Sequence, residues 1–250
     1  MATTRKALTH PVPTRRSPPR HTEPRPQLDE RQAREERILD AAAALLIRWG
    51  YRKTTVDDVA REAGVGKGTI YLHWKDKSAL FAATLRRASR RLITYTIQQI
   101  AADPAGGLPH RLWTHSMLAA FSDPLMAAVM SGQSDILQGL TSVFPAAALQ
   151  QMAGDYEEYI VRLQRAGLIR TDLPVSVITL LTSALKIGLI NTPDVLGTGQ
   201  RPSVEQLTEA ISDLIRRWLE PDRPPGDSEV GKQLLIAWLE KLRAVEDQLV

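Results

Sequence analysis

The sequence predicts an all-α protein made of two helical modules. Apolar residues recur every three or four positions through most of the chain, which is the spacing of a helix that buries one face. Clusters of Pro, Gly, Asp and Asn interrupt this pattern at distances that suit helix ends, and strand signals are absent from residue 103 onward. A length of 250 residues is sufficient for two separate helical modules.

Residues 1–27 differ from the rest because they hold six prolines among Arg and Thr residues. Such a composition cannot build a hydrophobic core. We therefore predict a disordered basic arm over 1–27, followed by a first helix over about 29–49 that Gly50 ends. The apolar stripe of this helix consists of Ile38, Leu39, Ala42, Leu45, Leu46 and Trp49.

A short second helix is predicted to begin at Thr54 and Thr55, whose hydroxyls can accept hydrogen bonds from free backbone N–H groups. Asp57 or Asp58 would complete a capping box. Gly64 should end this helix, because a residue without Cβ adopts the left-handed conformation at low cost. The apolar face between these ends consists of Val56, Val59, Ala60 and Ala63.

A third helix is predicted over 66–74. Ile70 and Trp74 are four residues apart, so both should point into the core. Gly66 and Gly68 lower the helix propensity, but they allow the backbone to approach a phosphate closely. The outward face consists of Lys67, Thr69, Leu72 and His73. Two short helices joined by a tight turn indicate a DNA-binding helix-turn-helix, whose second helix lies in the major groove.

A long connector helix should follow over about 77–102, with Asp76 as its N-cap. Further helices are predicted over 109–121, 124–131, 145–167, 174–190, 203–219 and 228–248. The helix at 174–190 is apolar on nearly all sides, so several of its sides must be covered. We predict that it forms a four-helix dimer interface together with the helix at 203–219 and a second copy of the chain. Burial within one subunit is the alternative.

The stretch ILDAAAALLIRWGYRKTTVDDVAREAGVGKGTIYLHWKDKSALF resembles the TetR family of bacterial one-component repressors. The stretch and the family share, in the same order, an apolar helix, Thr-Thr, an Ala-Gly-Val turn, Lys-Gly-Thr, an aromatic cluster and a trailing Lys. The resemblance implies phosphate contacts from Thr55 and Lys77, base contacts from Lys67, Thr69 and Leu72, backbone contacts from Tyr71 and His73, and close approach at Gly68. Leu72 stands where many members carry a polar residue, and it could contact a thymine methyl group instead.

By the same resemblance, the connector helix links the DNA-binding domain to a C-terminal domain that binds a small molecule. Large apolar side chains of the central helices are the candidates for that pocket, with packing in the core as the alternative for each. They are Trp113, Met117, Phe121, Met126, Met130, Tyr156 and Tyr159. Such a lining predicts an apolar or aromatic effector.

The charge distribution agrees with a DNA partner for the N-terminal part. Net charges are +3 for residues 1–30, +7 for 31–100 and −6 for 101–250, within a total of +4. Binding of a polyanion by the basic part should weaken steeply with salt. The arginines of the arm either enter the minor groove beside the site or only keep the chain soluble.

Other classes of protein fit less well. The chain has no cysteine, which excludes disulfides, thiolate metal sites and cysteine nucleophiles. The weakly charged run at 175–190 contains Lys186 and is too short to span a membrane, so we expect a cytoplasmic protein. An all-α enzyme is disfavoured because His110 and His115 do not share a helical face and the acidic residues at 155–158 have no His or Cys nearby. We expect neither a metal nor a cofactor.

The sequence therefore predicts a homodimeric repressor that a small-molecule ligand releases from operator DNA. The predicted organisation is an arm at 1–27, a three-helix DNA-binding domain at 28–75, and a helical ligand-binding and dimerisation domain at 76–250. A helical interaction module without sequence-specific DNA binding is the alternative.

Overall fold

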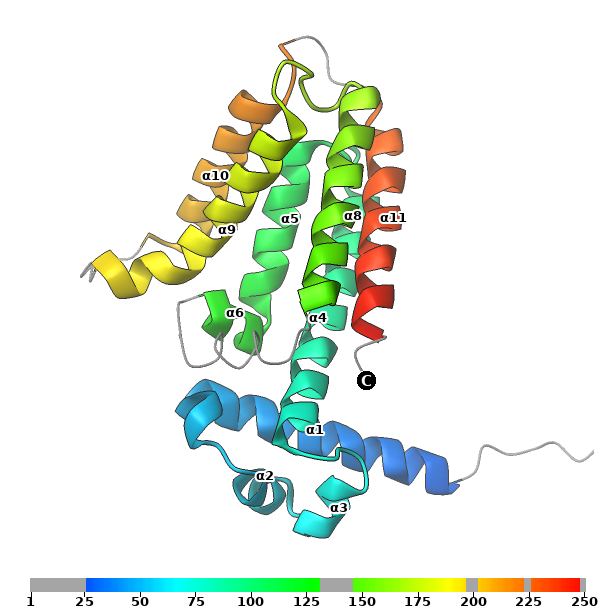
Figure 1. Cartoon of the computed structure of the whole chain (residues 1–250), viewed down its shortest axis with the longest axis vertical. Coiled ribbons are helices and arrows are strands. Elements are labelled where there is room, and N and C mark those ends of the chain that lie inside the picture. Colours follow the sequence, from blue (N-terminus) through cyan, green and yellow to red (C-terminus); the bar gives the residue numbers. More distant parts are fainter. Residues whose placement is uncertain (1–25, 131–145, 197–201, 223–225, 248–250) are drawn as a thin grey trace, which may run out of the picture.

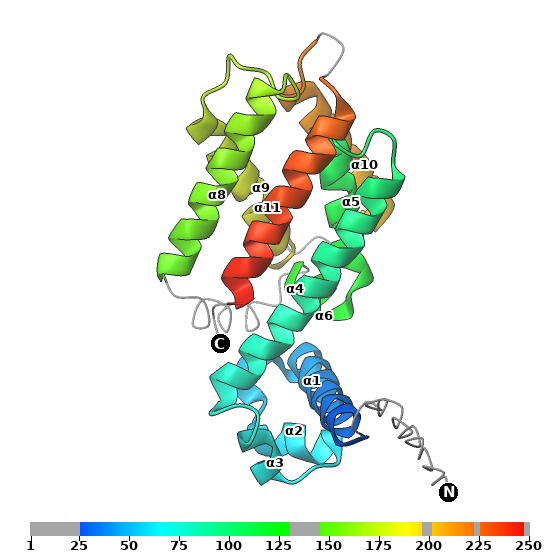
Figure 2. The ribbon, with the colours of Figure 1, turned by 90° about the vertical axis from the view of Figure 1, so that its right-hand side faces the viewer.

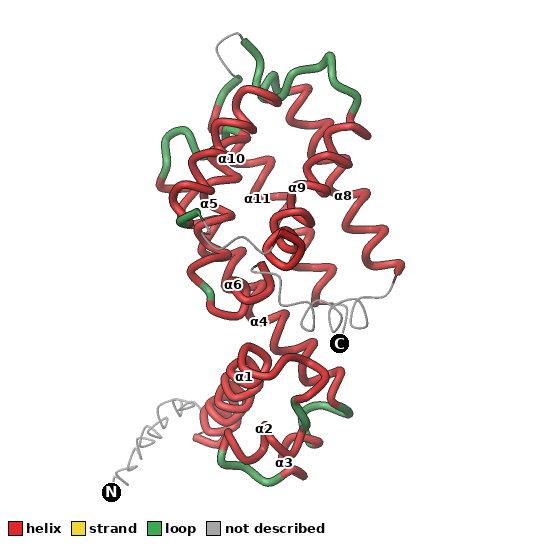
Figure 3. The backbone as a smooth tube through the Cα atoms, turned by 90° about the vertical axis from the view of Figure 1, so that its left-hand side faces the viewer, coloured by secondary structure: helices red, strands yellow, loops and turns green. Residues whose placement is uncertain are grey.

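The computed structural model describes residues 26–130, 146–196, 202–222 and 226–247. Within these ranges the regular structure is entirely helical, as Figure 1 and Figure 3 show. The predicted all-α fold is therefore confirmed. Nearly all of the predicted basic arm lies outside the described residues, as does residue 131 at the end of one predicted helix.

The described helices match most of the predicted ones to within three residues. They are α1 (Pro26–Lys53), α2 (Val56–Ala63), α3 (Lys67–Tyr71), α4 (Lys77–Ala102), α5 (Pro109–Ser122), α6 (Pro124–Met130), α8 (Ala146–Arg165), α9 (Val175–Leu196), α10 (Val204–Leu219) and α11 (Ser228–Asp247). No helix among them combines the length and apolar character that crossing a membrane requires.

Two of the longer helices, α1 and α9, end later than predicted. Helix α1 extends to Lys53, although Gly50 inside it has φ 76° and ψ 175°. The expected break at Gly50 is thus a kink, after which one further turn continues. Helix α9 extends to Leu196 instead of ending at 190. Pro193 removes one backbone N–H from this helix, but it does not prevent a last turn beyond it.

Two hydrophobic cores lie along the molecule, and helix α4 contributes to both. The lower core takes buried residues from α1, α2, α3, the first half of α4 and the short helix α6. The upper core takes residues from the second half of α4 together with α5, α8, α9, α10 and α11. Figure 1 and Figure 2 show α4 rising from the unit of α1, α2 and α3 into the upper bundle. Helix α4 is therefore a continuous rod between the two halves.

The C-terminal helix α11 packs against α8 and α4, and its apolar residues Leu235 and Leu239 are buried in the upper core (Figure 2). Its first turn touches the loop between α4 and α5. A Cβ atom on Gly107 would lie 1.8 Å from the carbonyl oxygen of Ser228, and one on Gly231 would lie 2.2 Å from the oxygen of Gly107. Ser228 Oγ accepts a hydrogen bond from Gly107 N and donates one to the oxygen of Pro104. Glycines thus allow direct backbone contact here.

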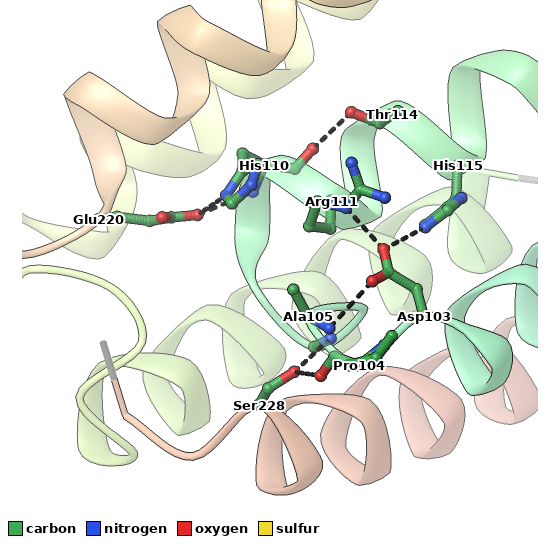
Figure 4. Close-up of polar contacts among 10 residues, drawn as sticks. Asp103, Pro104, Ala105, His110, Arg111, Thr114, His115, Glu220 and Ser228 are labelled. Atoms are coloured by element: carbon green, nitrogen blue, oxygen red, sulfur yellow. Dashed lines mark hydrogen bonds and ion pairs between the residues drawn. The ribbon is translucent and has the colours of Figure 1, made fainter. Parts of the chain in front are cut away.

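A polar junction joins the end of α4 to α5 and α10 (Figure 4). Asp103 Oδ2 accepts a hydrogen bond from Arg111 Nε at 2.6 Å and lies 2.8 Å from His115 Nε2. Nearby, Glu220 Oε1 accepts a hydrogen bond from the backbone of His110 and lies 2.7 Å from its Nδ1. Both carboxylates are largely covered, with side chains 13% and 8% exposed. At this junction the two largely buried carboxylates, Asp103 and Glu220, therefore both have hydrogen-bond partners.

We expect Asp103→Asn to destabilise the protein by about 2 kcal/mol at about pH 7. Burial raises the pKa of Asp103, but hydrogen bonds from His115, Arg111 and the Ala105 N–H outweigh it and lower this pKa from 3.8 to about 2. A lowered pKa contributes stability that is present above the unfolded value and is lost as the pH falls through the folded value. Urea unfolding of both proteins should show a difference that shrinks between about pH 4 and pH 2. A constant difference would contradict this account.

Helices α9 and α10 each present apolar side chains to solvent. Val177, Leu180 and Leu181 of α9 are 39%, 68% and 46% exposed, and Leu214 of α10 is 50% exposed. In contrast, Ile178 of α9 is fully buried in the upper core. Large exposed leucines on one chain are typical of a surface that a partner covers.

Candidate DNA-binding interface

The two threonines before α2 have different roles. Thr55 is the N-cap: its Oγ1 accepts a hydrogen bond from Asp58 N, and its own N–H donates to Asp58 Oδ2. The capping box expected from Asp57 or Asp58 is therefore made by Asp58. Thr54 is fully buried, and its hydroxyl donates to the carbonyl oxygens of Gly50 at 2.8 Å and Leu45 at 3.3 Å. The expectation that Thr54 also helps to cap α2 is wrong, because its hydroxyl bonds to the end of α1.

The turn between α2 and α3 has the predicted form. Gly64 lies in the left-handed region with φ 64° and ψ 36°, and its N–H faces the last carbonyls of α2. Val65 donates its N–H to Ala60 O and packs against the lower core. This turn fixes the direction in which α3 leaves α2.

Helix α3 is shorter than predicted, since it ends at Tyr71 and not at 74. The N–H groups of His73 and Trp74 both bond to Ile70 O, so residues 72–73 form a tight turn instead of a further helical turn. Ile70 and Trp74 are 1% and 8% exposed, which confirms that both belong to the core. Outward, Tyr71 is 47% exposed and Leu72 82% exposed. Helix α3 thus presents a free face at the tip of the molecule (Figure 1).

Gly68 lies in the middle of α3, and nothing in the fold of the protein requires a glycine at this position. A Cβ built there would meet no atom within 4 Å, and the backbone does not have a positive φ. Glycine inside a helix costs about 1 kcal/mol relative to alanine. The space left free by this residue is therefore open to a molecule outside the chain.

The two lysines among the predicted DNA contacts, Lys67 and Lys77, have partners within the chain. Lys67 Nζ lies 2.8 Å from Asp57 Oδ2, and this hydrogen bond raises the pKa of Lys67. Lys77 Nζ lies 4.6 Å from the ring centre of Tyr51 and 3.4 Å from Arg52 O, and burial lowers the pKa of Lys77. The sequence reasoning missed Asp57 as a partner, because the pair is ten residues apart and forms only when α2 and α3 fold together.

His73 lies differently from the expectation that it faces outward with its neighbours. Its side chain is only 9% exposed, and its ring packs against Trp74 with centroids 5.2 Å apart. The Nδ1 atom lies 3.8 Å from Glu35 Oε2 of α1. His73 also lines a cleft of about 660 Å³ between α1 and the start of α4. In this conformation His73 connects the end of α3 to α1.

The residues predicted for an effector pocket are divided between the two cores. Five of them, Trp113, Met117, Phe121, Tyr156 and Tyr159, belong to the upper core. Met126 packs against the lower core, and the side chain of Met130 is outside the described residues. The prediction treated these seven residues as one pocket lining. Helix α6 packs against α1, however, so Met126 lies at the lower core and apart from the other described residues of this set.

Within the upper core an aromatic cluster joins α8 to α11. The ring of Tyr159 stacks on Trp238 with centroids 5.2 Å apart, and Tyr156 lies 5.5 Å from Trp238. Tyr156 donates its hydroxyl hydrogen to Thr182 Oγ1 of α9 at 3.0 Å. Burial raises the pKa of both tyrosines. Trp238 was not among the predicted residues, because its place beside α8 depends on how the last helix folds back.

Comparison with known proteins supports the reading of α1 to α4 as a regulator's DNA-binding unit. Residues 38–84 match the family described as "Bacterial regulatory proteins, tetR family". The HTH-type transcriptional repressor Rv1474c of Mycobacterium tuberculosis is 24% identical over 77% of this chain and 96% of its own length. The uncharacterised HTH-type transcriptional regulator YhgD of Bacillus subtilis is 50% identical over 48 residues, which are 19% of this chain and 25% of that protein.

Solved structures share the fold over a longer range. NalD of Pseudomonas aeruginosa, described as the secondary repressor of the MexAB-OprM multidrug efflux pump, has a TM-score of 0.56 with 18% identity, covering 78% of this chain and all of that one. A putative TetR-family regulator from Rhodococcus has a TM-score of 0.54 with 23% identity, covering 76% of this chain and all of its own. Residues 38–84 therefore form a DNA-binding unit of the TetR family of helix-turn-helix transcriptional regulators.

Proposed function

We propose that the protein is a homodimeric repressor that binds a roughly palindromic operator and is released from it by a small molecule. Each subunit inserts α3 into the major groove, and the two insertions lie about one helical turn of DNA apart. The observation that carries this proposal is the free face of α3, where Leu72 is 82% exposed beside a glycine that the fold does not require. A protein that binds chromosomal DNA in this way works in the cytoplasm.

The DNA-contacting set that we propose follows the geometry of this face. Lys67, Thr69 and Leu72 face bases, Tyr71 contacts the backbone, and Gly68 lets the helix approach closely. Thr55 and Lys77 lie at the starts of α2 and α4, where exposed backbone N–H groups favour phosphate. On binding, the Lys67 ammonium would leave its ion pair with Asp57 and contact the DNA instead. His73 is part of the set by family resemblance, but its partner in the free protein is Glu35.

We assign residues 1–27 to a basic arm, 28–75 to DNA binding, and 76–250 to ligand binding and dimerisation. The exposed leucines of α9 and α10 support a second copy as the partner that covers them. The aromatic cluster of α8 and α11 supports an apolar or aromatic effector. An effector that prefers a dimer with differently spaced α3 helices lowers operator affinity by its differential affinity for the two states.

The test begins with selection of bound duplexes from a pool of randomised double-stranded DNA, using the purified full chain. Fluorescence anisotropy across a salt series then measures affinity for the selected duplex and for a shuffled one. Selective binding that weakens steeply with salt supports the repressor. Enrichment of no sequence would instead favour the helical interaction module without specific DNA binding.

We expect Gly68→Ala to stabilise the protein while weakening operator binding. Alanine raises helix propensity by about 1 kcal/mol and meets no atom of the protein, so unfolding should become harder. At the operator the added methyl group separates α3 from the DNA, and we expect affinity to fall about tenfold or more, as for the loss of one good contact. Thermal unfolding and anisotropy measure the two effects.

Gly154→Ala is the matched control for this prediction. Gly154 is an exposed glycine inside α8, and a Cβ there also meets nothing within 4 Å. It should stabilise the protein similarly and leave operator affinity unchanged. Equal affinities of the Gly68→Ala variant and the wild type would contradict close approach at this position.

A further inference from the structure

We propose that Arg87 is a positioning residue that sets the angle between the connector helix α4 and α1, and through it the operator spacing that the dimer accepts. The inference rests on the proposed function, since it concerns how two α3 helices are held relative to each other. Arg87 itself lies on α4, away from the recognition helix, and acts through α1.

Arg87 makes three contacts with α1. Its Nη1 donates to Glu36 Oε2 at 2.6 Å and to the carbonyl oxygen of Glu36 at 3.1 Å, while Nη2 donates to Asp40 Oδ1 at 2.7 Å. The Arg87 side chain is only 13% exposed, although its two carboxylate partners are 56% and 66% exposed. Arg91, one turn further along α4, adds a longer ion pair to Glu36 at 3.5 Å. We name this group of four side chains the α1–α4 clamp.

The clamp lies where α4 passes from one core to the other. Ala88 is the last residue of α4 in the lower core, and Ile93 is its first residue in the upper core. Between them, residues 90 and 91 are exposed and residues 89 and 92 are half-buried, so apolar packing alone leaves the tilt of α4 against α1 less restricted. Directional hydrogen bonds from a guanidinium supply the missing restraint at that point.

The chemistry of arginine suits this role. A planar guanidinium can bond two carboxylates and a carbonyl at once and in fixed directions, whereas a lysine ammonium is a single point charge on a flexible stem. Because α1 packs on α2 and the lower core includes α3, any rotation of α4 against α1 moves the recognition helix relative to the upper bundle. In a dimer joined through the upper bundles, that rotation changes the separation of the two α3 helices.

Operator spacing tests this directly. Inserting one base pair between half-sites moves them apart by about 3.4 Å and rotates one against the other by about 34°. A dimer with a stiff connection should lose affinity for the lengthened site, and one with a loosened connection should lose less. A residue that only stabilised the fold would not change this ratio.

The experiment compares the wild-type chain with Arg87→Lys on the selected duplex and on the same duplex with one central base pair inserted or removed. Net charge is unchanged, so the electrostatic attraction to DNA is matched. The wild type should discriminate about tenfold or more, in line with the loss of a half-site contact, and Arg87→Lys about threefold or less. Arg170→Lys is the control, because Arg170 also bonds one carboxylate, Asp172, through two nitrogens but lies between α8 and α9.

Asp40→Ala provides a second variant that removes one contact of the clamp and keeps Arg87. It should give an intermediate ratio. An unchanged spacing ratio in both variants, with selective binding retained, would overturn the role of Arg87 and leave the repressor intact. Absence of selective binding by the wild type would overturn the repressor, and this inference with it. Circular dichroism of each variant confirms that the compared proteins are folded.

Discussion

Leu180→Glu is expected to convert the proposed dimer into monomers and to weaken operator binding by about 10²- to 10⁴-fold. Leu180 is 68% exposed in a single chain, so a charged residue there does not disturb the subunit's own core. In the proposed dimer the same position is buried against a second copy, where an unpaired carboxylate is strongly unfavourable. A monomer holds one half-site only and loses the gain from linking two binding events.

Sedimentation or light scattering would measure the mass of the variant, and anisotropy its affinity for the selected duplex. Val230→Glu is the matched control, because Val230 is 39% exposed on α11, away from the leucines of α9 and α10. It should remain dimeric and bind normally. A Leu180→Glu protein with the mass and affinity of the wild type would place the subunit contact on another face.

Gly107→Ala is expected to have the largest effect on stability, with a loss of about 3 kcal/mol or more. The new Cβ would lie 1.8 Å from Ser228 O and 2.6 Å from Lys232 N, both of them backbone atoms. Overpacking against a side chain can relax by rotation, but backbone atoms at the start of α11 can move only if the helix moves. The α4–α5 loop and α11 would therefore separate, and the hydrogen bond from Gly107 N to Ser228 Oγ would be lost.

Urea unfolding at neutral pH measures this loss. Ser228→Ala removes the hydroxyl but keeps the backbone contact, so it should cost only about 1 kcal/mol and separates the two causes. Gly107→Ala with wild-type stability would mean that α11 is not held against this loop.

Most helices of this fold are predictable from the sequence because their determinants are local. The Thr55 cap, the left-handed Gly64 and the spacing of Ile70 and Trp74 each act within four residues. The ion-pair partners of the charged side chains, in contrast, are not determined by neighbouring residues in the sequence. Lys67 pairs with Asp57 ten residues away, and Arg87 with Glu36 fifty-one residues away. The spacing of apolar residues does not predict such contacts, because they form only after whole helices have packed together.

The two threonines at 54 and 55 illustrate the limit within a single motif. Their side chains have the same donors and acceptors, so both are equally good caps by composition. Only the kink at Gly50 turns a carbonyl toward Thr54 and leaves the capping position to Thr55. The residues predicted for an effector pocket show the same limit at a larger scale, because α6 directs Met126 to the lower core while Trp113 stays in the upper one.

The presence of one helix, α4, in both cores has a consequence for the amount of working protein. Loss of order in the upper core removes the support from half of α4, and the lower core then loses the packing of Leu80, Phe81, Leu85 and Ala88. The two halves should therefore unfold cooperatively. In the proposed repressor, a destabilising substitution far from the DNA would then reduce the cellular level of folded protein, and the target genes would be expressed even without the proposed effector.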